Sequence, residues 1–146
     1  MRNKEIGFKI HTLDLILRRR MLANAKENGI DEASAMHGWI VGVIYDSKED
    51  IFQKDIEARC HIARSSVTGI LQLMEKNGYI KRESVDYDAR LKKLVLTEKG
   101  VSLHKTKTKH HKEMEQIMAK DLTELEKQEF IRLADKIINS LKEAEK

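Results

Sequence analysis

Proline is absent from this sequence of 146 residues, and glycine occurs only seven times. Folds made of many short strands need frequent turns, and those turns draw on proline and glycine. A β-sandwich, a β-barrel and a collagen-like chain are therefore excluded, and a mainly helical fold is predicted. Apolar residues make up 40% of the chain and recur at regular spacing, which argues against disorder.

The sequence has one cysteine, Cys60, which excludes an intramolecular disulfide and a zinc site made of several cysteines. No signal peptide is expected, and no apolar run approaches the roughly 18 residues of a membrane span. These absences favour a cytoplasmic protein without a membrane partner. Phosphate-binding glycine loops, nucleophile elbows and metalloprotease helices are missing as well, so we expect neither an enzyme nor a bound cofactor or metal.

Charge is abundant but unevenly distributed. Charged residues make up 36% of the sequence and leave a net charge of +4. Residues 53–93 hold nine lysines and arginines against six acids, whereas residues 31–52 hold one lysine against five acids. The basic segment suits the phosphates of nucleic acid, although the small net charge alone does not predict that partner.

Helical spacing dominates the first third of the chain. Apolar residues three and four apart predict one helix over 6–25, which Gly29 ends. A second helix is predicted over about 34–45. Gly38 and Gly42 weaken it, and two glycines four apart indicate the close approach of another backbone or of a ligand.

The middle of the chain predicts two short helices and a hairpin. The helices cover about 53–59 and 64–76. Strand-like runs at 79–85 and 92–96 flank a polar segment, 86–91, which we interpret as the loop of a β-hairpin.

Two more helices complete the prediction. Thr97 is a candidate N-cap of a helix of about 25 residues, and Thr123 with Glu126 has the spacing of a capping box before a last helix with an apolar stripe. The fold class is therefore mainly α with a small β-hairpin.

Helix, turn, helix and hairpin in this order predict a winged helix-turn-helix. A helix that presents small polar side chains fits the major groove of DNA, and an arginine at a hairpin tip can enter the minor groove. Lysines nearby can neutralise phosphates. The candidate residues for binding double-stranded DNA are Lys54, Arg64, Ser65, Ser66, Thr68, Gln72, Asp88, Arg90, Lys92 and Lys93.

Each of these residues also has a simpler interpretation. The small polar residues of 64–76 could form a solvated helix face, and Arg90 could be an ordinary surface arginine, but the hairpin beside them favours DNA contact. Asp88 is interpreted as a partner that orients Arg90 rather than as an acid catalyst. Residues 18–20, a run of three arginines, are interpreted as a solvated helix face rather than a DNA patch.

The motifs in residues 53–100 resemble those of the MarR family of transcriptional regulators. They are "RSSVT" at the start of the second short helix, "LMEKNGYIKR" at its end, "DARLK" in the hairpin and "LTEKG" before the long helix. The pattern D-x-R-x-K falls on Asp88, Arg90 and Lys92. Two positions depart from the family: Gly69 replaces a basic residue common on the recognition helix, and Ala63 replaces the usual capping residue.

The resemblance implies a single MarR-type domain over 1–146, with a winged helix-turn-helix over about 34–97. It also implies a homodimer, held by helices at about 5–29 and 98–143. Small aromatic or lipophilic effectors would release this dimer from a pseudo-palindromic operator. The segment "GWIVGVIY" resembles repressors of drug-efflux genes.

Three residues near the paired glycines, Met36, Trp39 and Tyr45, are candidates either for the core or for an effector cleft. Cys60 is a candidate peroxide sensor but fits structural packing better. The chain also has histidines that could sense a metal, but His110 and His111 are adjacent and point about 100° apart on a helix. The open alternatives are thus a metal- or redox-sensing regulator of the same fold and a helical adaptor that binds protein.

Overall fold

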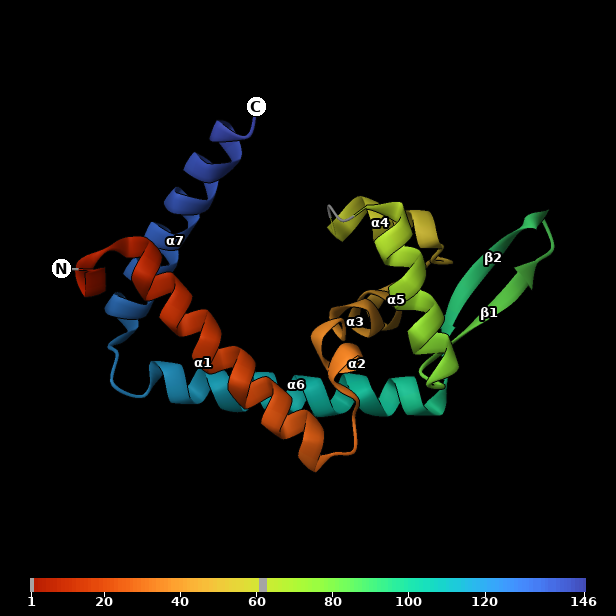
Figure 1. The fold of residues 1–146 in the computed structure, drawn as a ribbon, viewed down its shortest axis with the longest axis horizontal. Helices are drawn as coiled ribbons and strands as arrows, with labels where there is room; N and C mark the ends of the chain where they lie inside the picture. The colour runs from red at the N-terminus through yellow and green to blue at the C-terminus, as the bar shows by residue number, and fades with distance from the viewer. Residues whose placement is uncertain (1, 61–62) are drawn as a thin grey trace. The chain divides into compact units, whose positions relative to one another are not determined.

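The computed structural model describes residues 2–60 and 63–146. Helices form most of it, as the scarcity of turn residues predicts, and one antiparallel hairpin supplies both strands (Figure 1). In chain order the elements are η1 (Arg2–Lys4), α1 (Ile6–Glu27), α2 (Glu32–Met36), α3 (Trp39–Asp46), α4 (Gln53–Cys60), α5 (Arg64–Lys76), β1 (Ile80–Val85), β2 (Asp88–Leu96), α6 (Glu98–Ala119) and α7 (Glu124–Ala144).

Two compact units make up the chain, one ending at His110 and one over His111–Lys146. The first unit contains α1 to β2 and the beginning of α6, and the second contains the rest of α6 and α7. Among the described residues, none of the helices combines the length and the hydrophobicity that crossing a bilayer requires.

Residues 34–45, predicted as one helix, form the end of α2 and most of α3. Asp31 caps α2 by accepting a hydrogen bond from the Ser34 N–H at 2.9 Å, and the chain turns at residues 37–38 before α3 begins. A Cβ at Gly38 would collide with the Lys107 side chain of α6. The close approach predicted at the glycines therefore comes from side chains of α6, with the His104 ring 3.7 Å from a Cβ built at Gly42.

The hairpin turn is shorter than predicted. The strands pair from Ile80 with Leu96 to Val85 with Asp88, and a register shift lies between Ser84 and Val85. Only residues 86–87 separate the strands, so Arg90 lies within β2 rather than in a six-residue loop. Arg90 is exposed here although Val85, at the end of β1, is buried, so a polar side chain can lie within β2.

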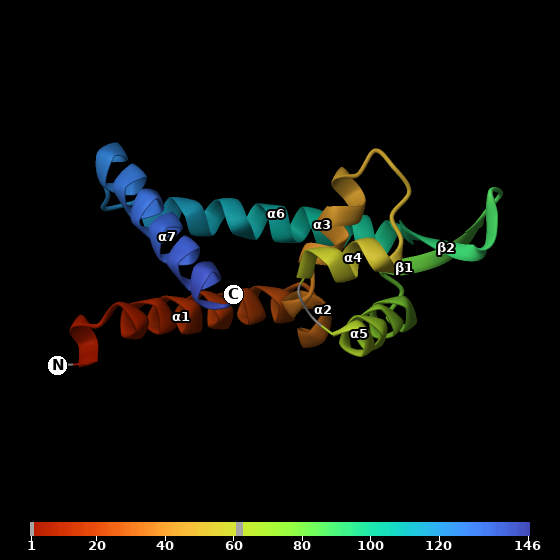
Figure 2. The same ribbon diagram turned by 90° about the horizontal axis from the view of Figure 1, so that it is seen from above.

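The winged lobe packs around one apolar core from α3 to α6. Figures 1 and 2 show α5 beside α4 and the hairpin projecting away from both. The buried members of the core are Ile40, Val41, Ile51, Ile56, Val67, Leu71, Met74, Tyr79, Ile80, Leu94 and Leu103. Burial of this set fixes the angle between α5 and the base of the hairpin, which are the two parts of the predicted DNA-binding surface.

The predicted stop and start signals act as expected. Gly29 and Gly78 have positive φ, 69° and 81°, just after α1 and α5. Thr97 accepts a hydrogen bond from the Gly100 N–H at 3.1 Å and so caps α6. Thr123 and Glu126 form the full capping box of α7.

Candidate nucleic-acid interface

Helix α5 separates into an apolar and a polar face. Val67, Leu71 and Met74 are buried, and their spacing of four and three residues is that of one helical stripe. The candidate residues Arg64, Ser65, Ser66 and Gln72 are exposed on the remaining surface, and Thr68 is half-buried. This helix therefore offers hydroxyls, an amide and a guanidinium to a groove while its other face holds it to the lobe.

The first turn of α5 has no side-chain cap. Ala63 occupies the N-cap with φ −55° and ψ 141°, and its methyl group cannot accept a hydrogen bond. A helix N-terminus without a side-chain cap is a place where an anion such as a DNA phosphate can bind. Within the described residues, a Cβ built at Gly69 would have nothing within 4 Å, so the helix surface is open there.

Arg90 is held in a fixed direction by Asp88. The Asp88 carboxylate accepts hydrogen bonds from the Arg90 backbone N–H at 2.9 Å, from Nε at 3.2 Å and from Nη2 at 3.1 Å. The side-chain and backbone hydrogen bonds from Arg90 lower the pKa of Asp88, so the partner stays charged. The Arg90 side chain is nevertheless 90% exposed, which leaves most of its guanidinium available to a ligand.

The two lysines that follow lie on opposite faces of β2 because successive strand side chains alternate. Lys92 is exposed, and its ammonium donates to the Ser84 hydroxyl at 2.5 Å. Lys93 is turned to the other face, where its Nζ lies 3.5 Å from Asp50. Lys54 is exposed on α4. The structure thus places Lys92 and Lys93 on opposite faces of the wing.

The hairpin is attached to the segment before α4. The Leu94 N–H donates to the Ile51 carbonyl at 2.7 Å, and the Tyr87 hydroxyl at the turn donates to Asp50 at 3.1 Å. Sequence analysis missed this attachment because Asp50 and Ile51 carry no strand pattern of their own. The wing is consequently held at its base and at its turn.

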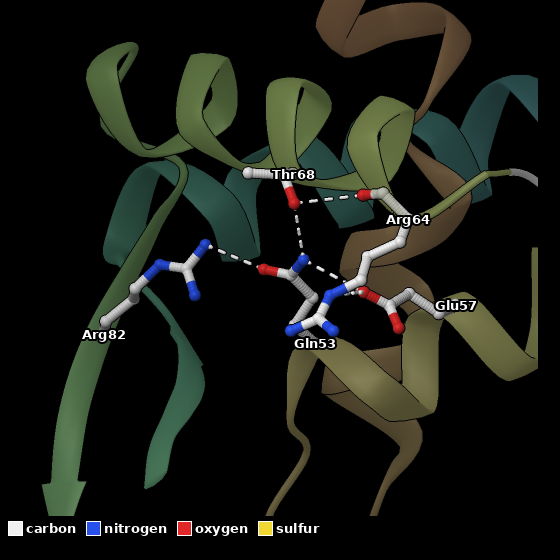
Figure 3. A network of polar contacts seen from close by, with 5 residues as sticks. All are labelled: Gln53, Glu57, Arg64, Thr68 and Arg82. Atoms are coloured by element: carbon white, nitrogen blue, oxygen red, sulfur yellow. Dashed lines mark hydrogen bonds and ion pairs between the residues drawn. The ribbon is translucent and has the colours of Figure 1, made fainter. Parts of the chain in front are cut away.

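A network of polar side chains joins α4, α5 and β1 (Figure 3). The Gln53 Nε2 donates to Thr68 Oγ1 at 2.7 Å and to Glu57 Oε1 at 3.0 Å. The Gln53 oxygen accepts from Arg82 Nη2 at 3.3 Å, and Arg64 Nε lies 3.7 Å from Glu57 Oε1. Sequence reasoning did not single out Gln53 or Arg82, whose partners lie 15 and 29 residues away.

Residues 34–91, which extend from α2 into β2, match the model of the MarR family. The match covers the helix-turn-helix and most of the hairpin. The lobe that contains these residues has a winged helix fold, which it shares with transcription regulators of that family. No curated protein matches the sequence.

Solved structures of MarR-type regulators share the fold. The S. aureus MepR–DNA complex has a TM-score of 0.80 at 22% identity, covering 93% of this chain and 98% of that chain. A regulator from Listeria monocytogenes complexed with a 26mer DNA has a TM-score of 0.75 at 20% identity, covering 94% and 89%. The heme sensor PefR, in complex with heme and carbon monoxide, has a TM-score of 0.68 at 27% identity, covering 92% and 88%.

The three effector candidates have different surroundings in the described part of the structure. Trp39 packs against the core and lines a cavity of about 350 Å³ between α3 and α4. Tyr45 is 50% exposed and stacks on His104 at 4.3 Å between ring centroids, and Met36 is 37% exposed. The full lining of the Trp39 cavity is Trp39, Gly42, Val43, Asp46, Ser47 and Arg59.

The metal and redox alternatives concern the histidines and Cys60. Within residues 2–60 and 63–146, no group of three histidine, cysteine or acidic side chains is close enough to hold an ion. His104 faces an aromatic ring instead. The side chain of Cys60, predicted to be packing, lies outside the described part of the structure.

A partly buried lysine joins α6 to α2. Lys107 donates a hydrogen bond to the Ala35 carbonyl at 2.9 Å and fills the space that Gly38 leaves open. Burial lowers the pKa of the Lys107 ammonium. An amine at the last carbonyls of α2 is favourably placed with respect to the helix dipole, which offsets part of its desolvation.

Proposed function

We propose that the chain is a ligand-responsive repressor that binds a pseudo-palindromic operator as a homodimer in the cytoplasm. The observation that carries this proposal is the exposed Arg90, held by Asp88 on a wing beside the polar face of α5. A recognition helix in the major groove and an arginine in the minor groove together read one half-site. The resemblance of residues 38–45 to repressors of drug-efflux genes supports control of efflux or stress genes.

Exposed apolar side chains at both ends of the chain support the homodimer. Helix α7 buries none of its side chains within the subunit, although Leu125, Phe130 and Leu141 are 78%, 58% and 61% exposed. In α1, Ile6 and Ile10 are 63% and 49% exposed. Such apolar stripes favour association, and a second copy of the chain is the partner that the proposed operator symmetry requires.

The test of operator binding is a gel shift and footprint with the DNA upstream of the protein's own gene. Half-sites about one helical turn apart are expected from the two-fold symmetry of the proposed dimer. Each neutralised phosphate contributes about −0.9 to the slope of log K against log salt. Several exposed cations per subunit therefore predict a slope steeper than about −3, and a shallower one contradicts a DNA-facing basic segment.

We further propose that a small aromatic or lipophilic effector binds beside Trp39. A cavity of about 350 Å³ lies within the range of small-molecule sites, and Arg59 on its rim offers a guanidinium to a carboxylate. Binding there would act on the angle between α3 and α4, and so on the spacing of the two recognition helices. The ligand can oppose DNA binding only if it binds more tightly to a spacing of the recognition helices that differs from the spacing required by DNA.

The single tryptophan makes this proposal directly measurable. Salicylate-like acids and lipophilic cations are titrated against Trp39 emission, with and without operator. We expect quenching compounds to weaken operator binding. Compounds that quench Trp39 and leave operator affinity unchanged exclude the cavity as a sensing site. Release of DNA by zinc or peroxide, with no organic compound effective, favours the metal- or redox-sensing alternative.

A further inference from the structure

We infer that Gln53 is a positioning residue that makes Thr68 read DNA only as a hydrogen-bond acceptor and ties this reading to the wing. Gln53 lies at the start of α4 and is half-buried between α5 and β1 (Figure 3). The inference rests on DNA binding through α5, because Thr68 lies on that helix.

The orientation of the Gln53 amide follows from its neighbours. An arginine side chain has no acceptor, so the group that faces Arg82 Nη2 at 3.3 Å must be the amide oxygen. The amide nitrogen therefore points the other way, toward Thr68 Oγ1 at 2.7 Å and Glu57 Oε1 at 3.0 Å. Both of its hydrogens are then used, and the carboxylate of Glu57 strengthens this orientation.

The hydroxyl of Thr68 is constrained in turn. A threonine hydroxyl has one hydrogen to donate and two lone pairs. The hydrogen goes to the Arg64 carbonyl at 3.0 Å, one turn earlier in the helix, and the Gln53 amide occupies one lone pair. One lone pair is left. Thr68 can therefore accept one further hydrogen bond and has none left to donate.

Thr68 lies on the same side of α5 as two solvent-exposed residues. Arg64, Thr68 and Gln72 are four residues apart, so they form one line along the helix. Arg64 is 86% exposed in its side chain and Gln72 is exposed. A groove that receives this line brings a base edge to the free lone pair of Thr68.

The chemistry of the bases then sets a preference. In the major groove, adenine N6 and cytosine N4 donate hydrogen bonds, whereas guanine and thymine present keto oxygens that only accept. An acceptor-only Thr68 pairs with an amino group and faces a keto oxygen unfavourably. We expect adenine or cytosine at the position in each half-site that meets Thr68.

The same amide couples this preference to the hairpin. Arg82 lies in β1 and binds both the Gln53 oxygen and, through Nε at 3.1 Å, Glu75 near the end of α5. Gln53 therefore connects Thr68 of the recognition helix with Arg82 of the wing. Loss of its side chain frees the Thr68 hydroxyl to turn and leaves Arg82 with Glu75 alone among these partners.

The experiment selects binding sites from a random DNA pool with the full chain and four variants. Thr68→Val removes the hydroxyl at constant shape, and Thr68→Ser keeps it. Gln53→Met removes the three polar contacts of the amide, with Thr68, Glu57 and Arg82, at similar side-chain length. Gln128→Met, the same replacement at an exposed residue of α7, is the matched control. Circular dichroism and thermal unfolding establish that each variant is folded before selection.

The expected result is a change in base preference rather than a uniform loss of binding. The wild-type chain and Thr68→Ser should prefer an amino-bearing base at one position per half-site by about fivefold, the equivalent of one neutral hydrogen bond. Thr68→Val and Gln53→Met should lose that preference at the same position, and Gln128→Met should keep it. If Gln53→Met fails to fold, the pair of Thr68 variants still decides the acceptor-only reading.

Two outcomes overturn the inference. A keto base at the Thr68-dependent position means that the hydroxyl donates. Unchanged base profiles in Thr68→Val and Gln53→Met, with affinity lowered for every sequence alike, mean that the network is structural only. A wild-type chain that enriches no sequence overturns operator binding itself and this inference with it, so the two failures are distinguishable.

Discussion

At the scale of single residues, exposure separates side chains that serve binding from those that serve folding. Arg90 and Lys107 illustrate the two cases. Arg90 is 90% exposed and donates hydrogen bonds to its neighbour Asp88, whereas Lys107 is partly buried and joins two helices. A substitution at the first should change DNA affinity, and a substitution at the second should change stability.

Arg90→Ala should weaken operator binding by about 1–3 kcal/mol without unfolding the protein, because little packing depends on this side chain. Fluorescence anisotropy with labelled operator measures the affinity, and thermal unfolding measures the stability. Lys93→Ala is the control: it removes an equal charge from β2 at a side chain that already faces Asp50. Equal losses in the two variants would contradict the assignment of Arg90 to the groove.

Lys107→Met should change the pH dependence of stability. Because the pKa of Lys107 is lowered in the folded chain, the unfolded chain binds more protons between that pKa and the ordinary value of about 10.4. As the pH increases across this window, the free energy of unfolding of the wild type should rise relative to that of the variant. At pH values below the window, the difference between the two should be constant. Urea unfolding at several pH values measures it, with exposed Lys105→Met as the control for the loss of charge.

At the scale of elements, the backbone of the hairpin base constrains the start of α6. A Cβ at Gly100 would collide with the Tyr79 carbonyl. That carbonyl also accepts the Thr97 backbone N–H at 3.2 Å, so it is not free to move away. The glycine in "LTEKG" thus serves the close packing of α6 on the end of β1.

Two glycine substitutions with opposite expected signs test this packing. Gly100→Ala should destabilise the chain by about 1–3 kcal/mol, since an added methyl group meets backbone. Gly69→Ala should stabilise it by about 0.5–1 kcal/mol, since α5 has nothing within 4 Å of the new Cβ and alanine favours a helix. Chemical denaturation measures both. A stable Gly100→Ala variant would show that the Tyr79 backbone yields.

Element order could be predicted from the sequence, but element boundaries depended on distant contacts. Apolar spacing continues across residues 36–39, so it could not reveal the break between α2 and α3. At this break the Lys107 side chain of α6 packs against Gly38. The polar composition of 86–91 could not reveal that β2 starts at Asp88. The Asp88–Arg90 pair was predictable because its motif is local, whereas Gln53 was not, because its partners lie far along the chain.

At the scale of the whole molecule, the proposed assembly depends on the exposed apolar side chains of α7. Leu125, Phe130, Leu133, Ile138 and Leu141 are all at least 45% exposed within one subunit. A soluble protein rarely leaves so many large apolar side chains on one helix in contact with water. The proposed homodimer would bury them.

Phe130→Glu should therefore convert the dimer to a monomer, because a buried carboxylate without a partner is costly at an interface. Sedimentation equilibrium at micromolar concentration should show a fall from about twice the chain mass of 16.9 kDa to a single chain. Gln128→Glu introduces the same charge on the polar side of α7 and should remain dimeric. A wild-type chain that sediments as a monomer would contradict the proposed assembly.

The attachment of the wing to Asp50 and Ile51 affects the thermodynamics of binding. Fixing one backbone residue costs about 1–2 kcal/mol of conformational entropy. A hairpin already held at its base and at its turn loses this freedom during folding, so little is left to lose when DNA arrives. Association should then proceed at a rate set by the encounter of charged surfaces, without a slow step in which a loop becomes ordered.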